Sequence, residues 1–282
     1  MRHPVIVAMA LAGSVALAGC EKPGDTDVKR ALDSVNVIDE SNLNDIMLTV
    51  ADPNEAVNYF RKASTAAPER LDLQRGLARS LIRARRTAEA ASIFAKIVKH
   101  PDAQNEDRVD YADALIRSGE WKKAAAQLNK VPPTHETFKR YRLEAMVADS
   151  NKDWKRADSF YETAVGLTTK PAGVLNNWGY SKLSQAKYDA AEKLFIQAIT
   201  YDETLFTAKN NLVLARGAQG KYQLPVIPMT QTEQAQLLHT LALSAIKKGD
   251  IVTGKTLLED AIHTHPQHFE AAVRSLRTLE KT

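Results

Sequence analysis

The sequence predicts an all-α protein, a solenoid built from antiparallel helix pairs. Two observations lead to this prediction. The 282-residue chain repeats itself at a period of about 34 residues, and periods of this size are typical of stacked repeat arrays. The recurring residues are small or apolar, and they follow the three- and four-residue spacing of one helix face. A single helix pair cannot bury such a face alone, so we expect stability to come from stacking of neighbours.

The clearest copy of the repeat is residues 172–205. Its recurring residues are Trp178, Gly179, Tyr188, Ala191, Phe195 and Ala198. This pattern resembles the tetratricopeptide repeat (TPR), in which two antiparallel helices meet at small side chains. The resemblance implies a right-handed superhelical solenoid. A side chain larger than alanine at the crossing would push the paired helices apart.

The same register places further copies before this one. Full repeats are expected at 71–104, 105–137 and 138–171. A divergent first repeat is expected at 37–70, where the second helix matches the pattern and the first is weakly patterned.

Towards the C-terminus the repeat is expected to break and then resume. A copy begins at residue 206, but Pro225 and Pro228 fall where its second helix should run. Proline there removes backbone donors and clashes with the preceding turn, so we expect an interrupted repeat at 206–231. A last repeat follows at 235–268, and residues 269–282 are expected to form a capping helix that shields the end of the stack.

The N-terminus predicts export and lipidation. A basic start, an apolar stretch and the sequence Leu17-Ala18-Gly19-Cys20 are typical of a signal peptide over residues 1–19. Leu-Ala-Gly-Cys resembles the bacterial lipobox, and Cys20 is the only cysteine of the chain. We therefore expect a lipid on Cys20, followed by a flexible tether over residues 20–36. Glu21 is not the aspartate that retains such lipoproteins in the inner membrane, which favours the outer membrane, facing the periplasm.

The composition does not indicate an enzyme or a nucleic-acid-binding protein. The chain is 44% hydrophobic and 26% charged, with a formal net charge of +4. We expect no small-molecule substrate, cofactor or metal, because no common catalytic motif occurs. Residues 249–256 fit the phosphate-loop expression, but a helical pattern precedes them instead of a strand. Histidines 263, 265 and 268 are interpreted as partners of carbonyls at a helix end.

The candidate binding surface is the concave face, which in TPR proteins is formed by the first helix of each pair. Its basic part is expected to suit carboxylates, and its amide groups to bind the backbone of an extended peptide. The candidate residues are Arg75, Arg79, Arg83, Arg117, Lys139, Arg142, Asn176, Tyr180, Asn210 and Leu214. We expect an acidic or C-terminal peptide of a partner protein there. The alternatives are that these charges are simply solvated, or that the convex face binds.

The apolar segment 224–229 is a second feature open to two interpretations. It either packs against its own solenoid, which we favour, or offers a docking strip for a partner. Monomeric proteins seldom leave contiguous apolar patches bare.

The chain as a whole resembles the TadD-type lipoproteins of tight-adherence (Tad) pilus assembly. The stretches that carry this resemblance are NNWGYSKLSQAKYDAAEKLFIQAI and KNNLVLARGAQGKY. It implies a pilotin-like or scaffolding role in building the secretin and pilus complex of Flp-type fimbriae. The alternative is a TPR lipoprotein that acts as an adaptor for periplasmic proteases or in outer-membrane protein assembly.

Overall fold

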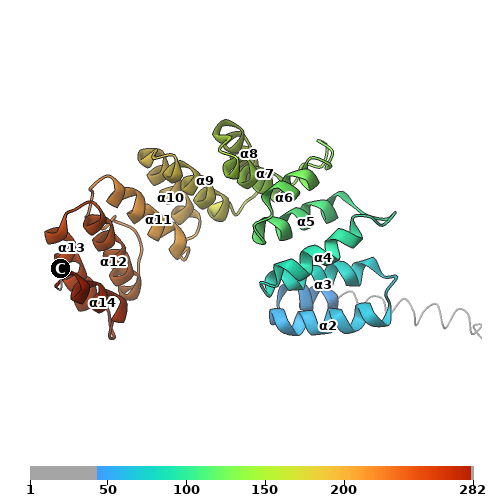
Figure 1. Ribbon diagram of the computed structural model, residues 1–282, viewed down its shortest axis with the longest axis horizontal. Helices are drawn as coiled ribbons and strands as arrows, with labels where there is room; N and C mark the ends of the chain where they lie inside the picture. The colour runs from blue at the N-terminus through green and yellow to red at the C-terminus, as the bar shows by residue number, and fades with distance from the viewer. Residues whose placement is uncertain (1–42, 281–282) are drawn as a thin grey trace, which may run out of the picture.

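The computed structural model describes residues 43–280, and these form an all-helical arch (Figure 1). The predicted signal peptide, Cys20, the tether and the first six residues of the divergent repeat lie outside the described residues. Within 43–280 there is no β-strand. No helix in that range is both long and apolar enough to cross a bilayer.

The helices follow one another as hairpins along the arch. Residues 43–49 are helical and precede α2. The remaining helices are α2 (Pro53–Ala66), α3 (Leu71–Arg83), α4 (Thr87–Ile97), α5 (Asn105–Arg117), α6 (Trp121–Leu128), α7 (Phe138–Ser150), α8 (Trp154–Gly166), α9 (Ala172–Ser184), α10 (Tyr188–Tyr201), α11 (Phe206–Ala218), α12 (Gln231–Lys247), α13 (Ile251–Thr264) and α14 (Glu270–Leu279).

The first helix of each pair lies on the inner side of the arch. Along the chain, α3 packs on α5, α5 on α7, α7 on α9, and α9 on α11. The second helices α4, α6, α8 and α10 show no comparable packing on one another in the described range. Elements on the inside of a curve are closest together, so the first helices form the concave wall and the second helices the convex one.

After the first helices α3, α5, α7, α9, α11 and α12 the chain turns at the same position of the repeat, the fifteenth. There the backbone is left-handed, at Gly119, Gly220 and Gly249 but also at Arg85, Lys152 and Ala186. Glycine adopts this conformation freely, whereas a residue with a side chain is destabilised by about 1 kcal/mol. The packing of the two flanking helices therefore overrides the local preference in three of the hairpins.

Helix crossings are closed by the small residues at the twentieth position of the repeat. These residues are Ala90, Ala124, Ala157, Ala191 and Gly254. The four alanines are completely buried. A Cβ atom added to Gly254 would lie 2.4 Å from Cγ1 of Ile246. The segment 249–256 is accordingly a tight turn followed by a helix that begins at Ile251, and it does not form a phosphate-binding loop.

The proline-containing segment replaces a helix between α11 and α12. Residues 219–230 contain no helix. Leu224 and Met229 pack against the core formed by α11 to α14, whereas Ile227 packs against the core of α9 to α11. Val226 is fully exposed, and Pro228 is exposed as well. The segment thus packs mainly against its own solenoid.

The helix after the interruption begins earlier than the repeat register predicts. α12 starts at Gln231, four residues before the expected repeat boundary at 235. Thr230 and Glu233 form a capping box, in which the Thr230 side chain binds the Glu233 amide and the Glu233 carboxylate binds the Thr230 amide. This cap satisfies two free amides at the helix start and extends the helix by a turn.

Candidate functional site: the concave groove

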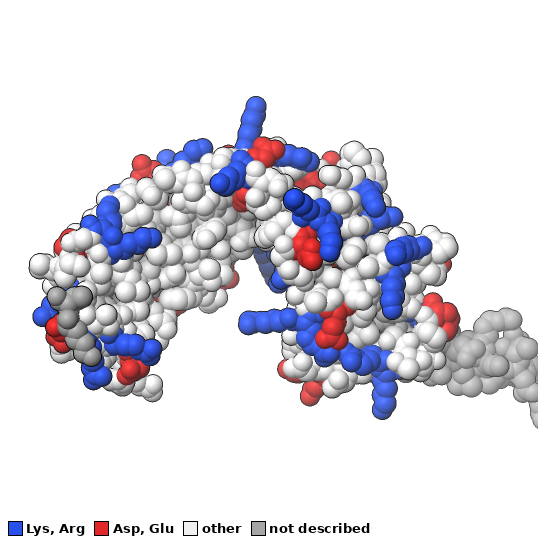
Figure 2. Space-filling model, viewed as in Figure 1, with Lys and Arg blue, Asp and Glu red and all other residues white. Residues whose placement is uncertain are grey.

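The inner side of the arch is hollowed, and its two halves differ in charge (Figure 2). Basic side chains project into the hollow from the N-terminal half, whereas the inner side of the C-terminal half is mostly uncharged. The candidate residues are distributed over both halves.

In the N-terminal half, Arg75 on α3 is held by Asp107 on α5. The guanidinium forms two bonds, Nε to Oδ1 and Nη2 to Oδ2, both at 2.7 Å. Asp107 is almost completely buried and also accepts a hydrogen bond from the Gln104 amide. This forked geometry is the strongest that arginine makes with a carboxylate. The pair raises the pKa of Arg75 above its usual value, chiefly through the hydrogen bond to Asp107.

Two further aspartates on α5 hold most of the other basic residues. Asp110 accepts hydrogen bonds from Arg79 Nε at 2.7 Å and from Lys139 Nζ. Asp113 accepts from Arg117 Nε at 2.8 Å. Asp110 therefore ties α3, α5 and α7 together across two repeat boundaries, whereas the Asp113–Arg117 pair lies within α5.

Arg83 has a different structural role. Its guanidinium donates to the carbonyl oxygens of Met47, Leu48 and Ala51 at 2.7–2.9 Å. The Met47 and Leu48 carbonyls lie in the last turn of the helical segment 43–49 and the Ala51 carbonyl lies just after it, and a cation stabilises such a helix end. Arg75, Arg79, Arg83 and Lys139 thus join neighbouring helix pairs, whereas Arg117 pairs with Asp113 within α5. Each of these five side chains already has a partner within the protein.

Arg142 on α7 is the exception among the basic candidates. In the described range no carboxylate lies within ion-pair distance of it, and its buried Nε has no hydrogen-bond acceptor. The guanidinium carbon lies 5.9 Å from the ring centroid of Phe138. Burial lowers the pKa of Arg142 below its usual value, because nothing fully compensates the charge.

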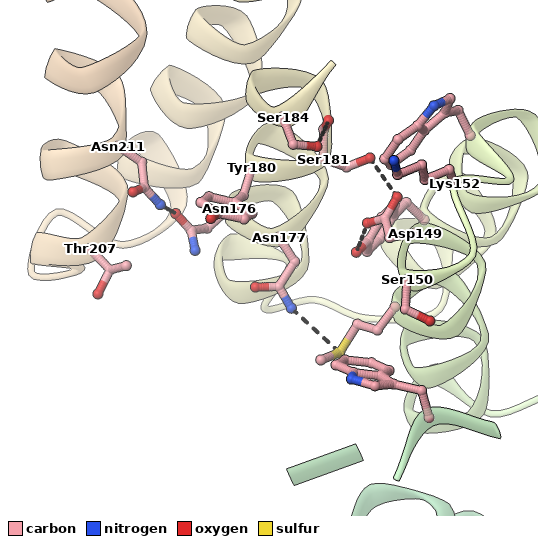
Figure 3. A pocket seen from close by; sticks show the side chains of 14 residues that line it. Asp149, Ser150, Lys152, Asn176, Asn177, Tyr180, Ser181, Ser184, Thr207 and Asn211 are labelled. Atoms are coloured by element: carbon pink, nitrogen blue, oxygen red, sulfur yellow. Dashed lines mark hydrogen bonds between the residues drawn. The ribbon is translucent and has the colours of Figure 1, made fainter. Parts of the chain in front are cut away.

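In the C-terminal half, a hollow of about 600 Å³ opens between α7, α9 and α11. Its lining is mainly apolar and aromatic, with several amide and hydroxyl groups. The residues include Trp121, Met146, Trp154, Tyr161, Asn176, Asn177, Tyr180, Ser181, Thr207 and Asn211. Figure 3 shows Asp149 and Ser150 of α7 on one side of the hollow and Asn177 and Ser181 of α9 facing them.

Amide side chains connect the first helices in this half. Asn211 Nδ2 on α11 donates to Asn176 Oδ1 on α9 at 3.0 Å (Figure 3). Asn210 Oδ1 accepts from Thr240 Oγ1 on α12 at 2.8 Å. The neighbouring Asn177 reaches only the weakly accepting sulfur of Met146, at 3.9 Å. The amide of Asn177 therefore retains strong hydrogen-bonding capacity towards a ligand.

The one carboxylate that lines the hollow is already satisfied by neutral donors. Asp149 accepts from Ser181 Oγ at 2.6 Å and from Tyr161 Oη at 2.8 Å. Burial raises the pKa of Asp149, and burial together with the adjacent carboxylate raises the pKa of Tyr161. These shifts follow from packing.

Tyr180 links this hollow to a second one. Its side chain is 58% exposed, and it lines both the first hollow and a neighbouring one of about 520 Å³. Leu183, Leu214 and Gly217 form the apolar part of the second hollow, and Lys247 and Lys248 lie at its α12 side. The two hollows form a continuous surface over α7 to α12, which we call the inner groove. Asn176, Tyr180 and Leu214 lie in it, whereas Asn210 lines neither hollow.

Sequence reasoning missed the three aspartates of α5. They occupy positions 107, 110 and 113, a three-residue spacing along one helix face. Comparing the same face in successive repeats would have paired them with the arginines of α3. The aromatic residues Trp121 and Trp154 were also missed as groove residues, because they begin second helices and enter the groove from its edge.

Comparisons with known proteins support the same fold. The tetratricopeptide repeat family matches residues 48–107. Mouse tetratricopeptide repeat protein 21B is 25% identical over 188 residues, which are 59% of this chain and 14% of that protein. The APC/C hetero-tetramer Cut9-Hcn1 is similar with a TM-score of 0.60 at 14% identity, over 81% of this chain and 46% of that chain.

Two further solved structures extend the fold similarity over nearly the whole chain. A tetratricopeptide repeat protein from Parabacteroides merdae has a TM-score of 0.54 at 13% identity, over 88% of this chain and 96% of that one. The human IFIT1 dimer with m7Gppp-AAAA has a TM-score of 0.60 at 14% identity, over 90% and 68%. The chain spans less than half of the mouse protein and of the Cut9-Hcn1 chain.

The repeat match and the architecture together define the fold of this chain as an all-α solenoid of the tetratricopeptide-repeat type. Proteins of this class generally mediate protein–protein interactions and are typically non-enzymatic scaffolds.

Proposed function

We propose that this protein is a non-enzymatic scaffold that binds an extended segment of another protein in its inner groove. The observation that carries the proposal is the contrast within the concave wall. The charges of the N-terminal half are used to hold the repeats together, whereas the α7–α12 half leaves an open hollow of about 600 Å³ with Tyr180 exposed in it.

The chemistry of the inner groove suits a polypeptide. Tyrosine and tryptophan provide large contact areas and are enriched where binding energy is concentrated. Asn177 has amide donors and an acceptor that an extended backbone can use, since among the described residues its side chain bonds only to a sulfur atom. The groove thus combines apolar contacts with backbone hydrogen bonds.

We further propose that the scaffold is held at the outer membrane, facing the periplasm, by lipid on Cys20. The support is the sequence Leu17-Ala18-Gly19-Cys20 together with the preceding basic and apolar residues. Replacing Cys20 by Ser should leave unprocessed precursor in whole cells and release the protein from washed membranes. Normal maturation and membrane association of that variant would contradict the lipid anchor.

The cellular role we propose is assembly of the Flp-type Tad pilus, with the secretin complex as partner. The support is the resemblance of residues 176–199 and 209–222 to the TadD-type lipoproteins. The groove binding and the pilus role are separate claims, so one can fail without the other.

Photo-crosslinking in native envelopes tests both claims. A photoreactive phenylalanine analogue replaces Tyr180 in the groove or, as the control, Ile196 on the convex helix α10, where the side chain is also about half exposed. We expect a specific crosslink from position 180 that is absent from position 196. The reverse pattern would contradict groove binding. Mass spectrometry of the product then identifies a secretin component, or instead a protease or an outer-membrane assembly factor.

A further inference from the structure

We infer that the first hollow of the inner groove takes a cationic side chain, a lysine or an arginine of the bound segment, with the Asp149 carboxylate as its counter-charge and aromatic rings beside it. The inference rests on the proposed function and names the chemistry of one side chain of the partner. It is the opposite of the expectation from the sequence, which was an acidic or C-terminal peptide.

Asp149 differs from the aspartates of α5 in having no cation. Those aspartates each pair with arginine or lysine side chains, at Asp107, Asp110 and Asp113. In the described range Asp149 forms no ion pair, and its bonds come from two hydroxyl groups, Ser181 Oγ on Oδ1 and Tyr161 Oη on Oδ2. A carboxylate offers about four acceptor positions. Two neutral donors therefore leave acceptor capacity unused and leave the charge unbalanced.

The charges of the protein around Asp149 do not compensate it. Asp158 and Lys182 act on it in opposite directions, and they pair with each other at 2.6 Å. Burial is the largest influence on Asp149 and raises its pKa above the usual value. Lys152 lines the same hollow, but it is exposed and no ion pair joins it to Asp149 within residues 43–280. A cation that enters the hollow therefore meets an unbalanced negative charge.

The repeat does not require a polar set at this place. Asp149 occupies the twelfth position of its repeat, which elsewhere holds Ile82, Ile116, Leu183 and Gly217. Tyr161 occupies the twenty-fourth position, which elsewhere holds Phe94, Leu128 and Phe195. These three side chains are buried and carry no hydroxyl group. Since the other repeats pack without a carboxylate and a hydroxyl at these positions, the Asp149–Tyr161 pair is a local feature of this hollow.

The aromatic lining of the hollow also suits a cation. The rings that line it belong to Trp121, Trp154, Tyr161 and Tyr180. The faces of tryptophan and tyrosine rings attract lysine and arginine, and the long stems of these side chains pack on apolar surface. Asp149 lies on the α7 side of the hollow, and Asn177 and Tyr180 lie on α9 (Figure 3). The hollow thus combines a counter-charge, aromatic contacts and an amide for the backbone of the bound segment.

Crosslinking of defined peptides to the purified full chain tests the inference. The probes are biotinylated alanine pentapeptides with lysine, arginine, norleucine or glutamate at the centre. The photoreactive phenylalanine analogue stands at position 180, where it keeps an aromatic ring. We expect the lysine and arginine peptides to be captured about tenfold better than the norleucine peptide, and the glutamate peptide least. Equal capture of all the peptides, or capture of none, would overturn the inference.

A pair of matched variants tests the role of Asp149 itself. Asp149→Asn keeps an acceptor but removes the charge, so it should abolish the preference for lysine over norleucine. The control is Glu162→Gln, which removes one negative charge from an exposed position on α8 and should leave the preference unchanged. A preference that survives in the Asp149 variant, or that both variants lose equally, would show that Asp149 is not the counter-charge.

A triple variant separates binding from folding. Asp149→Leu with Tyr161→Phe and Ser181→Ala gives these positions the side chains that other repeats have at Leu183, Phe195 and Ala215. Replacing a bonded polar set by apolar groups of similar shape is often neutral or stabilising. We expect a melting temperature equal to or above that of the parent chain, together with loss of the lysine preference. A markedly lower melting temperature would assign the polar set to folding and contradict the inference.

Crosslinking in native envelopes distinguishes the two possible failures. If position 180 captures no envelope protein, the proposed groove binding fails and this inference fails with it. The captured segment, sequenced by mass spectrometry, should contain a lysine or an arginine near the site of reaction, and its yield should fall in the Asp149→Asn variant. If a protein is captured without either property, groove binding stands and the cation site is wrong.

Discussion

Lys209 and Glu233 form a nearly buried ion pair across the point where a helix is missing from the solenoid. Lys209 Nζ on α11 lies 3.0 Å from both carboxylate oxygens of Glu233 in the first turn of α12. The Lys209 side chain is only 3% exposed. The same carboxylate accepts from the Thr230 amide at the start of α12. The pair therefore fixes the path of the chain after the proline-containing segment.

We predict that Glu233→Gln lowers the free energy of unfolding by about 3 kcal/mol, because it leaves the charge of Lys209 buried without a partner. Urea denaturation followed by circular dichroism measures the change. The double variant Lys209→Met with Glu233→Gln should recover most of the loss, since no buried charge remains. Glu203→Gln, at an exposed position, is the control. A loss in the Glu233 variant no larger than in this control would contradict the prediction.

The Arg75–Asp107 pair provides a second prediction about stability. Arg75→Met leaves a buried aspartate without its cation and should lower the free energy of unfolding by about 3 kcal/mol. Arg61→Met is the matched control, because Arg61 forms an exposed pair with Glu89 at 3.4 Å, and exposed pairs contribute less than about 1 kcal/mol. Equal melting temperatures for the two variants would show that the inner pair does not hold the repeats together.

Gly179 tests the close packing of the helix pair α9 and α10. A Cβ atom at Gly179 would lie 2.6 Å from the ring of Phe195, which is fully buried. We predict that Gly179→Ala lowers the free energy of unfolding by about 2 kcal/mol through overpacking. Gly173→Ala on the same helix meets no atom within 4 Å and should be neutral or slightly stabilising, because alanine favours helix. Thermal denaturation of both variants checks the contrast, and the opposite order would contradict it.

His239 is predicted to make the C-terminal cap sensitive to acid. Its Nε2 lies 3.1 Å from Ser275 Oγ on α14, and its ring meets Phe269 edge to face with the centroids 5.5 Å apart. Burial lowers the pKa of His239 below the usual 6.5. As the pH falls through 6.5, the unfolded chain takes up a proton that the folded His239 does not, so stability is lost towards lower pH.

The measurement is a pair of melting curves at about pH 7.5 and about pH 5, on either side of the ordinary histidine pKa. The parent chain should lose more stability on acidification than His239→Gln. His263→Gln, exposed on α13, should behave like the parent chain. If the His239 and His263 variants respond identically to pH, the burial of His239 does not govern the acid response.

Much of the architecture could be predicted from the sequence because it depends on local properties of the chain. The helix pairs follow from the spacing of small residues such as Ala191, which must be small wherever it meets a neighbouring helix. The interruption follows from Pro225 and Pro228, since proline cannot continue a helix. The positions of the groove residues Asn176 and Tyr180 likewise follow from counting along the repeat.

Only the tertiary structure decided which side chains of the concave wall already bond to other side chains of the protein and which do not. Arg75 and Arg142 occupy the same position of their repeats, but one is bonded to Asp107 and the other has no carboxylate within reach in the described range. That difference depends on side chains about one repeat away in the sequence and on how closely two helices cross. The early start of α12 and the entry of Trp121 into the groove were decided in the same way, by contacts between residues that no local pattern brings together.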